Sequence, residues 1–232
     1  MTGLVVRRPP RAAAETVDGF VGLGVATVHE AQGGTGLLSA AIRPVFAAPP
    51  VAGSALTVSV PPGDNWMLHV AVEQCRAGDF VVVAPTTPCD AGYVGELLAT
   101  AMQARGVRGL VVDSGCRDVA ELQAIGFPVW ARCICAAGTV KETLGSVNVP
   151  IVCAGQLVTP GDIVVADQDG VVIVSRVAAA GVLAAAHARD EREAAARQRY
   201  AAGELSLDLH GMRDRLAAKG LVYADEPPGE AL

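Results

Sequence analysis

Between Val51 and about Val174, short runs of β-branched and apolar residues alternate with segments whose apolar positions have helical spacing. The apolar runs are short and continuous, which is typical of strands that are buried on both faces of a sheet. They cover residues 55–60, 80–83, 109–112, 151–153 and 163–165, with helical spacing at 65–76 and 95–105. This alternation predicts an α/β fold.

Tight turns are expected between these elements. Each candidate turn contains a proline with a fixed φ, a permissive glycine or an Asp side chain that can accept a hydrogen bond from the backbone. They are Pro61–Asp64, Ala77–Asp79, Pro160–Asp162 and Asp167–Gly170. The sequence contains no internal repeat and no long linker, so one core domain is expected.

The chain changes character near Arg176. Alanine-rich sequence with interleaved Arg and Glu continues to about Ala201, and a second amphipathic segment covers Leu205–Leu221. A helix with so weak an apolar stripe is marginal alone. We therefore expect an α/β core at 1–175 and a C-terminal helical extension at 176–232, packed on the core or on a neighbouring subunit.

Composition excludes several classes of protein. With 51% hydrophobic and 18% charged residues the chain is expected to fold. Its net charge of −6 and the absence of a Lys/Arg run argue against a nucleic-acid partner. Because no apolar stretch reaches the ~18 residues of a membrane span, and because the N-terminus lacks a signal-peptide pattern, we expect a cytoplasmic protein without a membrane partner.

The six cysteines lie mostly in apolar runs and form no C-x-x-C pair, which favours buried thiols in a reducing compartment. The Cys133-Ile134-Cys135 spacing is too tight for a zinc knuckle. The glycines near Phe20 do not form a dinucleotide fingerprint, and no Walker sequence occurs. A nucleotide cofactor is not expected.

Glu96 is predicted at the start of a helix, after the glycine-containing segment Asp90–Gly95. The amides of Leu97 and Leu98 would then be among the unpaired donors of a helix N-terminus, where a substrate carboxylate can bind. The alternative is that Glu96 only complements the helix dipole.

A second candidate cluster, Asp113–Asp118, follows the predicted strand at 109–112 and precedes a helix that begins at Val119. Ligand sites gather at such strand ends. Arg117 offers a planar fork for a carboxylate or an enolate, and Asp118 offers a hard oxygen ligand for Mg²⁺ or Mn²⁺. Alternatively, Asp118 caps its own helix and Arg117 pairs with a nearby acid.

The order Glu96, twenty intervening residues, Arg117-Asp118 resembles the acid-x20-Arg-Asp signature of the 4-hydroxy-4-methyl-2-oxoglutarate and 4-carboxy-4-hydroxy-2-oxoadipate aldolases. These belong to the superfamily of the regulator of ribonuclease activity A. The resemblance covers about residues 15–225. Its further motifs are Thr27–Ala31, Asn65–His69, Gly95–Ala99, Gly138–Lys141, Val147–Pro150, Pro160–Asp162, Gly203–Asp208 and Gly211–Arg213.

Two positions depart from the family pattern. The first acid of the signature is commonly Asp, whereas this chain has Glu96. By the resemblance this acid would hold water on a divalent metal, and the longer Glu side chain would place that water slightly differently. Gly34 stands where Arg is expected, so a functional role for the loop after His29-Glu30-Ala31 is in doubt.

The resemblance implies a swivelling phosphohistidine-domain-like β/β/α core, assembled as homotrimers or homohexamers with sites at subunit boundaries. It also implies a divalent metal, Mg²⁺ or Mn²⁺, bound directly by Asp118 and through water by Glu96. Arg117 would stabilise the enolate oxygen, and the 95–98 segment, with the Leu97 and Leu98 amides, would bind the pyruvyl carboxylate. A metal and a guanidinium together suit the charge of a pyruvate enolate, and water would carry the proton.

Further residues are assigned by the same resemblance. Glu193 would reach the metal waters of an adjacent subunit, with Glu191 as one alternative and a solvated i,i+4 ion pair as the other. Lys141 lies where it could bind the distal carboxylate of the substrate, or it is simply solvated. For His29 and His69 we expect polar-satisfied core positions rather than a place beside the metal site.

The implied function is a lyase that cleaves 4-hydroxy-4-methyl-2-oxoglutarate to two pyruvates, or 4-carboxy-4-hydroxy-2-oxoadipate to pyruvate and oxaloacetate. Oxaloacetate decarboxylation is an expected side activity, and both reactions fit the breakdown of aromatic compounds. The competing hypothesis is a non-catalytic regulator of an RNA-processing ribonuclease on the same scaffold. A third is an aldolase for another 2-keto acid.

Overall fold

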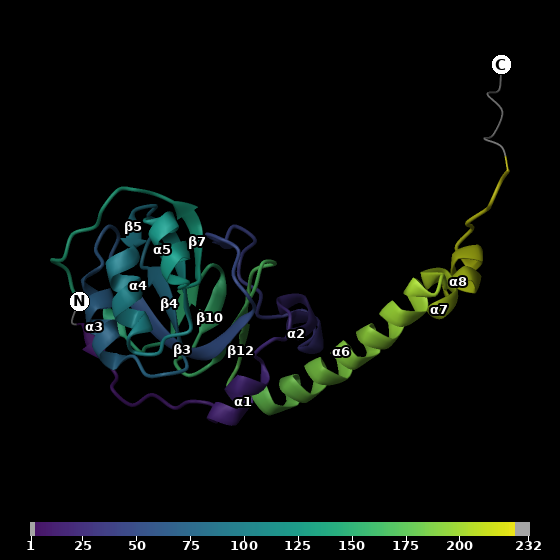
Figure 1. Cartoon of the computed structure of the whole chain (residues 1–232), viewed down its shortest axis with the longest axis horizontal. Helices are drawn as coiled ribbons and strands as arrows, with labels where there is room; N and C mark the ends of the chain where they lie inside the picture. Colours follow the sequence, from purple (N-terminus) through teal and green to yellow (C-terminus); the bar gives the residue numbers. More distant parts are fainter. Residues whose placement is uncertain (1–2, 226–232) are drawn as a thin grey trace, which may run out of the picture. The chain divides into compact units, whose positions relative to one another are not determined.

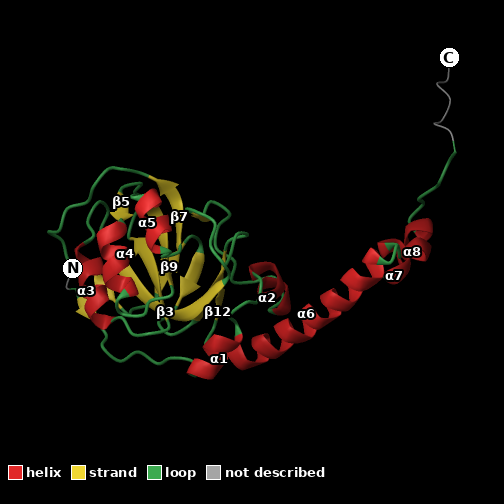
Figure 2. Ribbon diagram, in the orientation of Figure 1, coloured by secondary structure: helices red, strands yellow, loops and turns green. Residues whose placement is uncertain are grey.

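The structure, a computed structural model, describes residues 3–225 and contains a ten-stranded mixed sheet (Figures 1 and 2). Its main path, in spatial order, is β1 (Leu4–Val5), β8 (Ser146–Val147), β3 (Val51–Val60), β4 (Asp79–Pro85), β6 (Gly109–Cys116), β7 (Val129–Ile134) and β2 (Arg43–Pro44). Off this path, β5 (Gly92–Val94) pairs with β6, while β11 (Ile163–Ala166) pairs with β3 and with β12 (Val171–Val174).

The centre of the sheet consists of the parallel strands β3, β4, β6 and β7. The valine-rich sequences of β3, β4 and β6 are buried on both faces, as their continuous apolar runs predict. Because these strands are parallel, their carboxyl ends meet at one edge of the sheet. The loops that leave this edge carry Arg117 and Asp118.

Three helices cover one face of the sheet (Figure 1): α3 (Trp66–Gln74), α4 (Glu96–Gln103) and α5 (Val119–Ile125). Along β3, Leu56 and Val58 point to this helical face, whereas Ala55 points to the opposite one. The opposite face packs against a two-stranded antiparallel sheet, β9 (Ile151–Cys153) and β10 (Gln156–Val158). The core therefore has helix, sheet and small-sheet layers, and the predicted α/β fold is confirmed.

A third hydrophobic cluster lies around β11 and β12. It joins α1 (Ala14–Gly19), α2 (Val25–Ala31) and the start of α6 (Ala179–Ala201) to the sheet. Gly19 allows this packing, since a Cβ there would lie 2.6 Å from a methyl carbon of Leu183. The first turns of the C-terminal extension are thus anchored on the core by Ala179, Leu183 and Ala186.

The extension is helical, as predicted, but its second segment differs from the expected single element. Residues 205–221 form two short helices, α7 (Ser206–Leu209) and α8 (Met212–Ala218). Gly211 separates them with a left-handed φ of 57°, which interrupts a right-handed helix. The last residues of the predicted extension, 226–232, lie outside the described residues.

The chain divides into two compact units, Met1–His187 and Ala188–Leu232. The first contains every strand of the described chain and its large hydrophobic clusters. In the second, none of the described residues 188–225 is buried. Across residues 3–225 no helix combines the length and the apolar character that a membrane crossing requires.

Candidate active site

A hollow of about 140 Å³ lies at the carboxyl edge of the parallel strands and brings together distant parts of the sequence. Its walls come from the start of α3, from the segment that enters α4, from the loop between β6 and α5, and from the loop that carries Lys141. The lining residues are Asn65, His69, Tyr93, Gly95, Leu97, Leu98, Arg117, Asp118 and Lys141. The structure therefore gathers most of the residues predicted for the site.

Gly95 and Asp118 form the closest contact of this hollow. The Oδ2 atom of Asp118 accepts a hydrogen bond from the amide of Glu96 at 3.1 Å. A Cβ on Gly95 would lie only 2.2 Å from that same oxygen. Gly95 has an extended backbone, so the position needs glycine for space and not for its φ angle. The missing side chain lets the Asp118 carboxylate reach the N-terminus of α4.

Asp118 precedes α5, yet its side chain does not cap that helix. Its backbone is left-handed, with φ 59° and ψ 43°, a conformation that Asp tolerates better than most residues. The carboxylate bonds across to α4 instead, so the simple capping alternative is wrong. Arg117 lies beside it, with Nε 3.8 Å from the Asp118 Oδ2 atom, and both side chains are about half exposed.

The N-terminus of α4 faces the hollow as predicted. The helix begins at Glu96, and its first internal hydrogen bond runs from the Ala99 amide to the Gly95 carbonyl. The amides of Leu97 and Leu98 precede that bond, which leaves them outside the helix ladder. The Glu96 carboxylate accepts a hydrogen bond from the Thr100 hydroxyl at 2.7 Å. This contact holds the acid over the first turn of its own helix.

Asn65 and Tyr93 belong to the hollow, although sequence reasoning did not select their side chains. Asn65 is buried, and its amide nitrogen donates to the Tyr93 carbonyl at 3.0 Å. Its Oδ1 atom is buried and has no hydrogen-bond partner among the described residues. A buried acceptor without a partner, in a residue that lines the hollow, indicates a missing donor such as a hydroxyl or a water molecule. The only indication of Asn65 in the sequence was the Asn65–His69 motif of the family resemblance.

The loop that carries Lys141 is fastened to the core by Asp64. This buried carboxylate accepts hydrogen bonds from the amides of Trp66, Glu142 and Thr143 at 2.7–2.8 Å. Burial alone would raise the pKa of Asp64, but the three amide donors and the positive charge of Lys141 together lower that pKa below its usual value. The exposed Lys141 is thereby held at the rim of the hollow.

The two histidines have different surroundings. His69 is exposed and lines the hollow, so the predicted core position is wrong for this residue. Partial desolvation and the nearby Lys141 charge lower the pKa of His69, which favours the neutral ring. His29 is half-buried, and its Nδ1 atom is hydrogen-bonded to the Thr35 carbonyl at 2.9 Å. Gly34 follows with a φ of 77°, which an arginine would adopt only with strain.

Within residues 3–225 of a single chain, no group of three His, Cys, Asp or Glu side chains is arranged to hold a metal ion. The donors of the hollow nevertheless fit a hydrated hard cation. Mg²⁺ prefers oxygen ligands, keeps several waters and is commonly bound through one or two carboxylates. Asp118 has a solvent-facing carboxylate, with a side chain 41% exposed, and it is bonded to the backbone amide of Glu96. The Glu96 carboxylate itself bonds Thr100 and is not among the residues that line the hollow.

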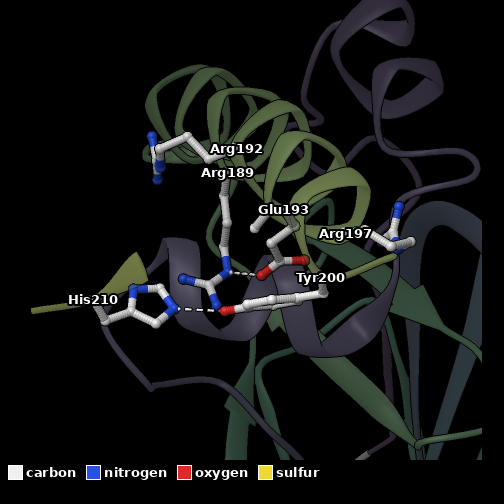
Figure 3. A pocket seen from close by; sticks show the side chains of 7 residues that line it. Arg189, Arg192, Glu193, Arg197, Tyr200 and His210 are labelled. Carbon is white, nitrogen blue, oxygen red and sulfur yellow. Dashed lines mark hydrogen bonds and ion pairs between the residues drawn. The ribbon is translucent and has the colours of Figure 1, made fainter. Parts of the chain in front are cut away.

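Glu193 lies in the C-terminal unit, on α6. Its carboxylate pairs with Nε of Arg189 at 2.8 Å, one helical turn away (Figure 3). Both residues line another hollow, of about 600 Å³, on the C-terminal unit, where the Tyr200 hydroxyl is hydrogen-bonded to His210 at 2.8 Å. The predicted i,i+4 ion pair is therefore present. The role of Glu193 or Glu191 toward a second subunit stays a prediction.

The six cysteines are all free thiols. Cys75, Cys116 and Cys153 are buried, whereas Cys89, Cys133 and Cys135 are only partly buried. Burial raises the pKa of Cys75 and of Cys116 to about 12. The buried thiols are thus packing groups and not nucleophiles.

Comparison with known proteins identifies relatives of this chain. A family model described as RraA-like, Aldolase/RraA, matches residues 18–173. A protein of Halalkalibacterium halodurans that carries the provisional name 4-hydroxy-4-methyl-2-oxoglutarate aldolase is 30% identical over 166 residues. That match covers 72% of this chain and 79% of the relative.

Solved structures show the same fold. Streptomyces coelicolor RraAS2, described as an unusual member of the RNase ES inhibitor RraA family, superposes with a TM-score of 0.72 at 27% identity. The match covers 81% of this chain and 98% of that one. An uncharacterized protein of Pseudomonas syringae pv. tomato has a TM-score of 0.74 at 23% identity, covering 84% and 96% of the two chains.

Proposed function

The chain belongs to the RraA-like family, Aldolase/RraA, and on that premise we propose that it is a divalent-metal-dependent aldolase that releases pyruvate from 4-hydroxy-2-oxo acids. The substrates proposed are 4-hydroxy-4-methyl-2-oxoglutarate and 4-carboxy-4-hydroxy-2-oxoadipate, with oxaloacetate decarboxylation as a side activity. The observation that carries the proposal is the contact of Asp118 with the N-terminus of α4, across the space left by Gly95. It brings the N-terminus of α4, a guanidinium and a carboxylate together in one hollow, which supports the proposal.

Different residues of the hollow would bind different groups of the substrate. The Leu97 and Leu98 amides, at the positive end of α4, would bind the carboxylate next to the 2-oxo group. Arg117 would donate to the 2-oxo oxygen as negative charge develops there during cleavage of the carbon–carbon bond. Lys141, at the rim, would meet the distal carboxylate. Neither amide needs to move, because the helix already presents both.

Asp118 would bind the cation directly and Glu96 through water. When bound, Mg²⁺ or Mn²⁺ would polarise the 2-oxo group and lower the pKa of nearby water. The Glu96 amide fixes the Asp118 carboxylate, so this acid keeps one orientation while its other oxygen stays available. Asn65, with its buried unpartnered Oδ1, would accept a hydrogen bond from the 4-hydroxyl group of the bound substrate and so orient it, and that contact would be given up when the proton is transferred to water.

We further propose that the protein works as a homotrimer or homohexamer in which Glu193 completes the site of an adjacent subunit. The lack of buried residues in the described part of the C-terminal unit, 188–225, supports association through that unit, since helices with so little buried surface are marginal alone. Tyr200, Leu205 and Met212 are apolar groups that this unit leaves exposed. Light scattering on the purified protein measures the assembly.

The direct test is to incubate the purified protein with each substrate, in Mg²⁺ or in EDTA, and to follow pyruvate. We expect turnover in Mg²⁺ that EDTA abolishes. Turnover that persists in EDTA, or none in either condition, would contradict the mechanism.

A second candidate function, a non-catalytic regulator of a ribonuclease, is favoured by the likeness to the ribonuclease-inhibitor family member from Streptomyces coelicolor. The intact Glu96, Arg117 and Asp118 constellation supports the enzyme, because a regulator that binds by its outer surface does not need it. Inhibition of a ribonuclease by a catalytically silent Arg117→Ala variant would instead support the regulator.

A further inference from the structure

A second hollow lies at the opposite edge of the sheet, where the parallel strands begin. Ser54 is near the start of β3 and pairs in register with Asp79, the first residue of β4. The hollow has a volume of about 200 Å³ and is lined by Arg11, Arg76 and Arg108 together with Ser54. A water molecule takes ~30 Å³ in the liquid, so the space is large enough for a small ion and its waters.

Two buried polar donors in this hollow have no hydrogen-bond partner among the described residues. One is the hydroxyl of Ser54, whose residue is only 6% exposed. The other is Nε of Arg11, whose remaining guanidinium nitrogens both bind the Asp79 carboxylate. Buried polar groups are almost always satisfied, so two unsatisfied donors around one space indicate a missing acceptor.

The charges in this hollow also favour an anion. Arg11, Arg76 and Arg108 face two carboxylates, those of Asp79 and Asp18. Arg11 is neutralised by Asp79, and Arg108 pairs with the half-exposed Asp18 at 2.5 Å. Within the part of the chain that the structure describes, Arg76 makes no ion pair, and its guanidinium has only a long contact of 3.5 Å to the Arg7 carbonyl. One positive charge is thus in excess.

The backbone keeps this space open. Gly78 has a φ of 89°, and a Cβ there would lie 3.8 Å from a terminal nitrogen of Arg108. A longer side chain at position 78 would extend into the hollow beside that guanidinium. Glycine satisfies both the left-handed turn after α3 and the open approach to Arg108.

We propose that this hollow is a second binding site, separate from the candidate active site, for a small oxyanion that bears a phosphate or carboxylate group. Ser54 donates its hydroxyl to the anion, and Arg76 and Arg108 supply charge-assisted hydrogen bonds. Arg11 and Asp18 belong to the segment that enters and forms α1, whereas Ser54 and Arg76 belong to the core. A bound anion therefore ties α1 to the sheet and stabilises the folded protein.

The test is calorimetric titration with inorganic phosphate and, in a separate arm, with succinate. Both are carried out in an Arg117→Ala background, which removes one cation of the candidate active site, and only the binding that Arg76→Gln weakens in this background is assigned to the second hollow. We expect saturable binding of at least one anion and a matching rise in the melting temperature. The anion that binds more tightly identifies the group as phosphate or carboxylate. Arg76→Gln is expected to weaken binding about tenfold, since it removes a charge-assisted contact.

Ser54→Ala separates binding from folding. It removes a hydroxyl that bonds nothing described, so the ligand-free melting temperature is expected to stay equal or to rise, while affinity for the anion falls severalfold. Arg43→Gln, on an exposed arginine elsewhere, is the matched control and is expected to bind like the parent. The proposal is overturned if neither anion binds saturably at millimolar concentration, or if Arg76→Gln and Ser54→Ala titrate like Arg43→Gln.

Discussion

The Asp118 carboxylate accepts a hydrogen bond from the Glu96 amide at 3.1 Å, across a gap that exists only because residue 95 has no side chain. The acid and the Arg-Asp pair of the sequence signature, which twenty intervening residues separate, are thereby joined into one site. The contact also explains why Asp118 leaves its own helix uncapped. Its carboxylate is committed to α4, and the position of the acid depends on the space at Gly95.

Gly95→Ala tests that dependence. The added methyl carbon would lie 2.2 Å from the Asp118 Oδ2 atom, so the carboxylate must rotate away from α4. We expect kcat/KM for pyruvate release to fall by roughly 100-fold, since small misplacements of a catalytic group have effects of this size. The extended backbone of Gly95 suits alanine, and circular dichroism should therefore show an unchanged fold. Gly181→Ala, with open space around it, is the control.

Arg117→Ala and Asp118→Asn each remove one charge from the hollow. Asparagine tolerates the left-handed backbone of position 118, so the local fold is retained. We expect losses of roughly 100- to 1000-fold in kcat for Arg117→Ala, the size found when a group that stabilises developing negative charge is deleted. For Asp118→Asn we expect weaker activation by Mg²⁺ in addition. Asp169→Asn, outside the hollow, is the control and should keep wild-type rates. Wild-type rates in Arg117→Ala or Asp118→Asn would mean that the site lies elsewhere.

Asn65 offers a test of substrate orientation. If its Oδ1 atom accepts from the 4-hydroxyl group, Asn65→Ala should lower kcat/KM for 4-hydroxy-4-methyl-2-oxoglutarate by about tenfold. Oxaloacetate in its keto form has no such hydroxyl, so its decarboxylation should be much less affected. The ratio of the two rates in one preparation is the measurement. Equal losses on both substrates would indicate that Asn65 only supports the backbone at Tyr93.

The lowered pKa of Asp64 leads us to expect that the attachment of the loop carrying Lys141 contributes less to stability in acid. Its folded-state pKa is lowered, so its contribution to stability is present above the ordinary Asp value and is lost as the pH falls through the folded pKa. Asp64→Asn is expected to lower the free energy of unfolding by about 2–3 kcal/mol at pH 7, because an amide group cannot accept all three backbone donors. Urea unfolding at pH 7 and near pH 3 should show this difference shrinking in acid. Asp190→Asn, on an exposed side chain, should cost little at either pH.

Local sequence patterns were sufficient to predict the helices and strands that carry Glu96, Arg117 and Asp118. The helix starts at Glu96 and Val119 were expected where the structure has them, because each follows a strand or turn and opens a run of helical apolar spacing. The central strands β3, β4 and β6 were expected as continuous apolar runs. The same reasoning did not predict β7. In the second half of this strand Arg132 and Ile134 are exposed and Cys133 between them is partly buried, so the strand has no continuous apolar run.

The walls of the hollow depend on tertiary contacts that no local pattern contains. Asp64 accepts hydrogen bonds from the amides of Glu142 and Thr143, which lie 78 and 79 positions away in the chain. Its local sequence context predicts only a turn. Asn65 becomes an acceptor of the site because Tyr93 fixes its amide. His69 looked like a core residue from its type, yet the end of α3 on which it lies faces the hollow.

The predicted partnership between subunits can be tested by complementation. If Glu193 completes the site of an adjacent chain, then Glu193→Gln lowers activity by roughly 10- to 100-fold, as for groups that orient a metal site from outside. Arg117→Ala is inactive for a different reason. When the two variants are co-expressed, about a quarter of the sites regain both residues in a symmetric oligomer with random mixing. Activity should then exceed that of either variant alone.

The matched control for this experiment is Glu191→Gln in place of Glu193→Gln. Glu191 lies two positions earlier on α6, on a more exposed face, so its loss should leave activity close to wild type. If Glu191→Gln is the damaging variant and complements Arg117→Ala, the partner residue is Glu191. If neither variant complements, although light scattering shows mixed oligomers, each site is built within one chain and the role of α6 is assembly alone.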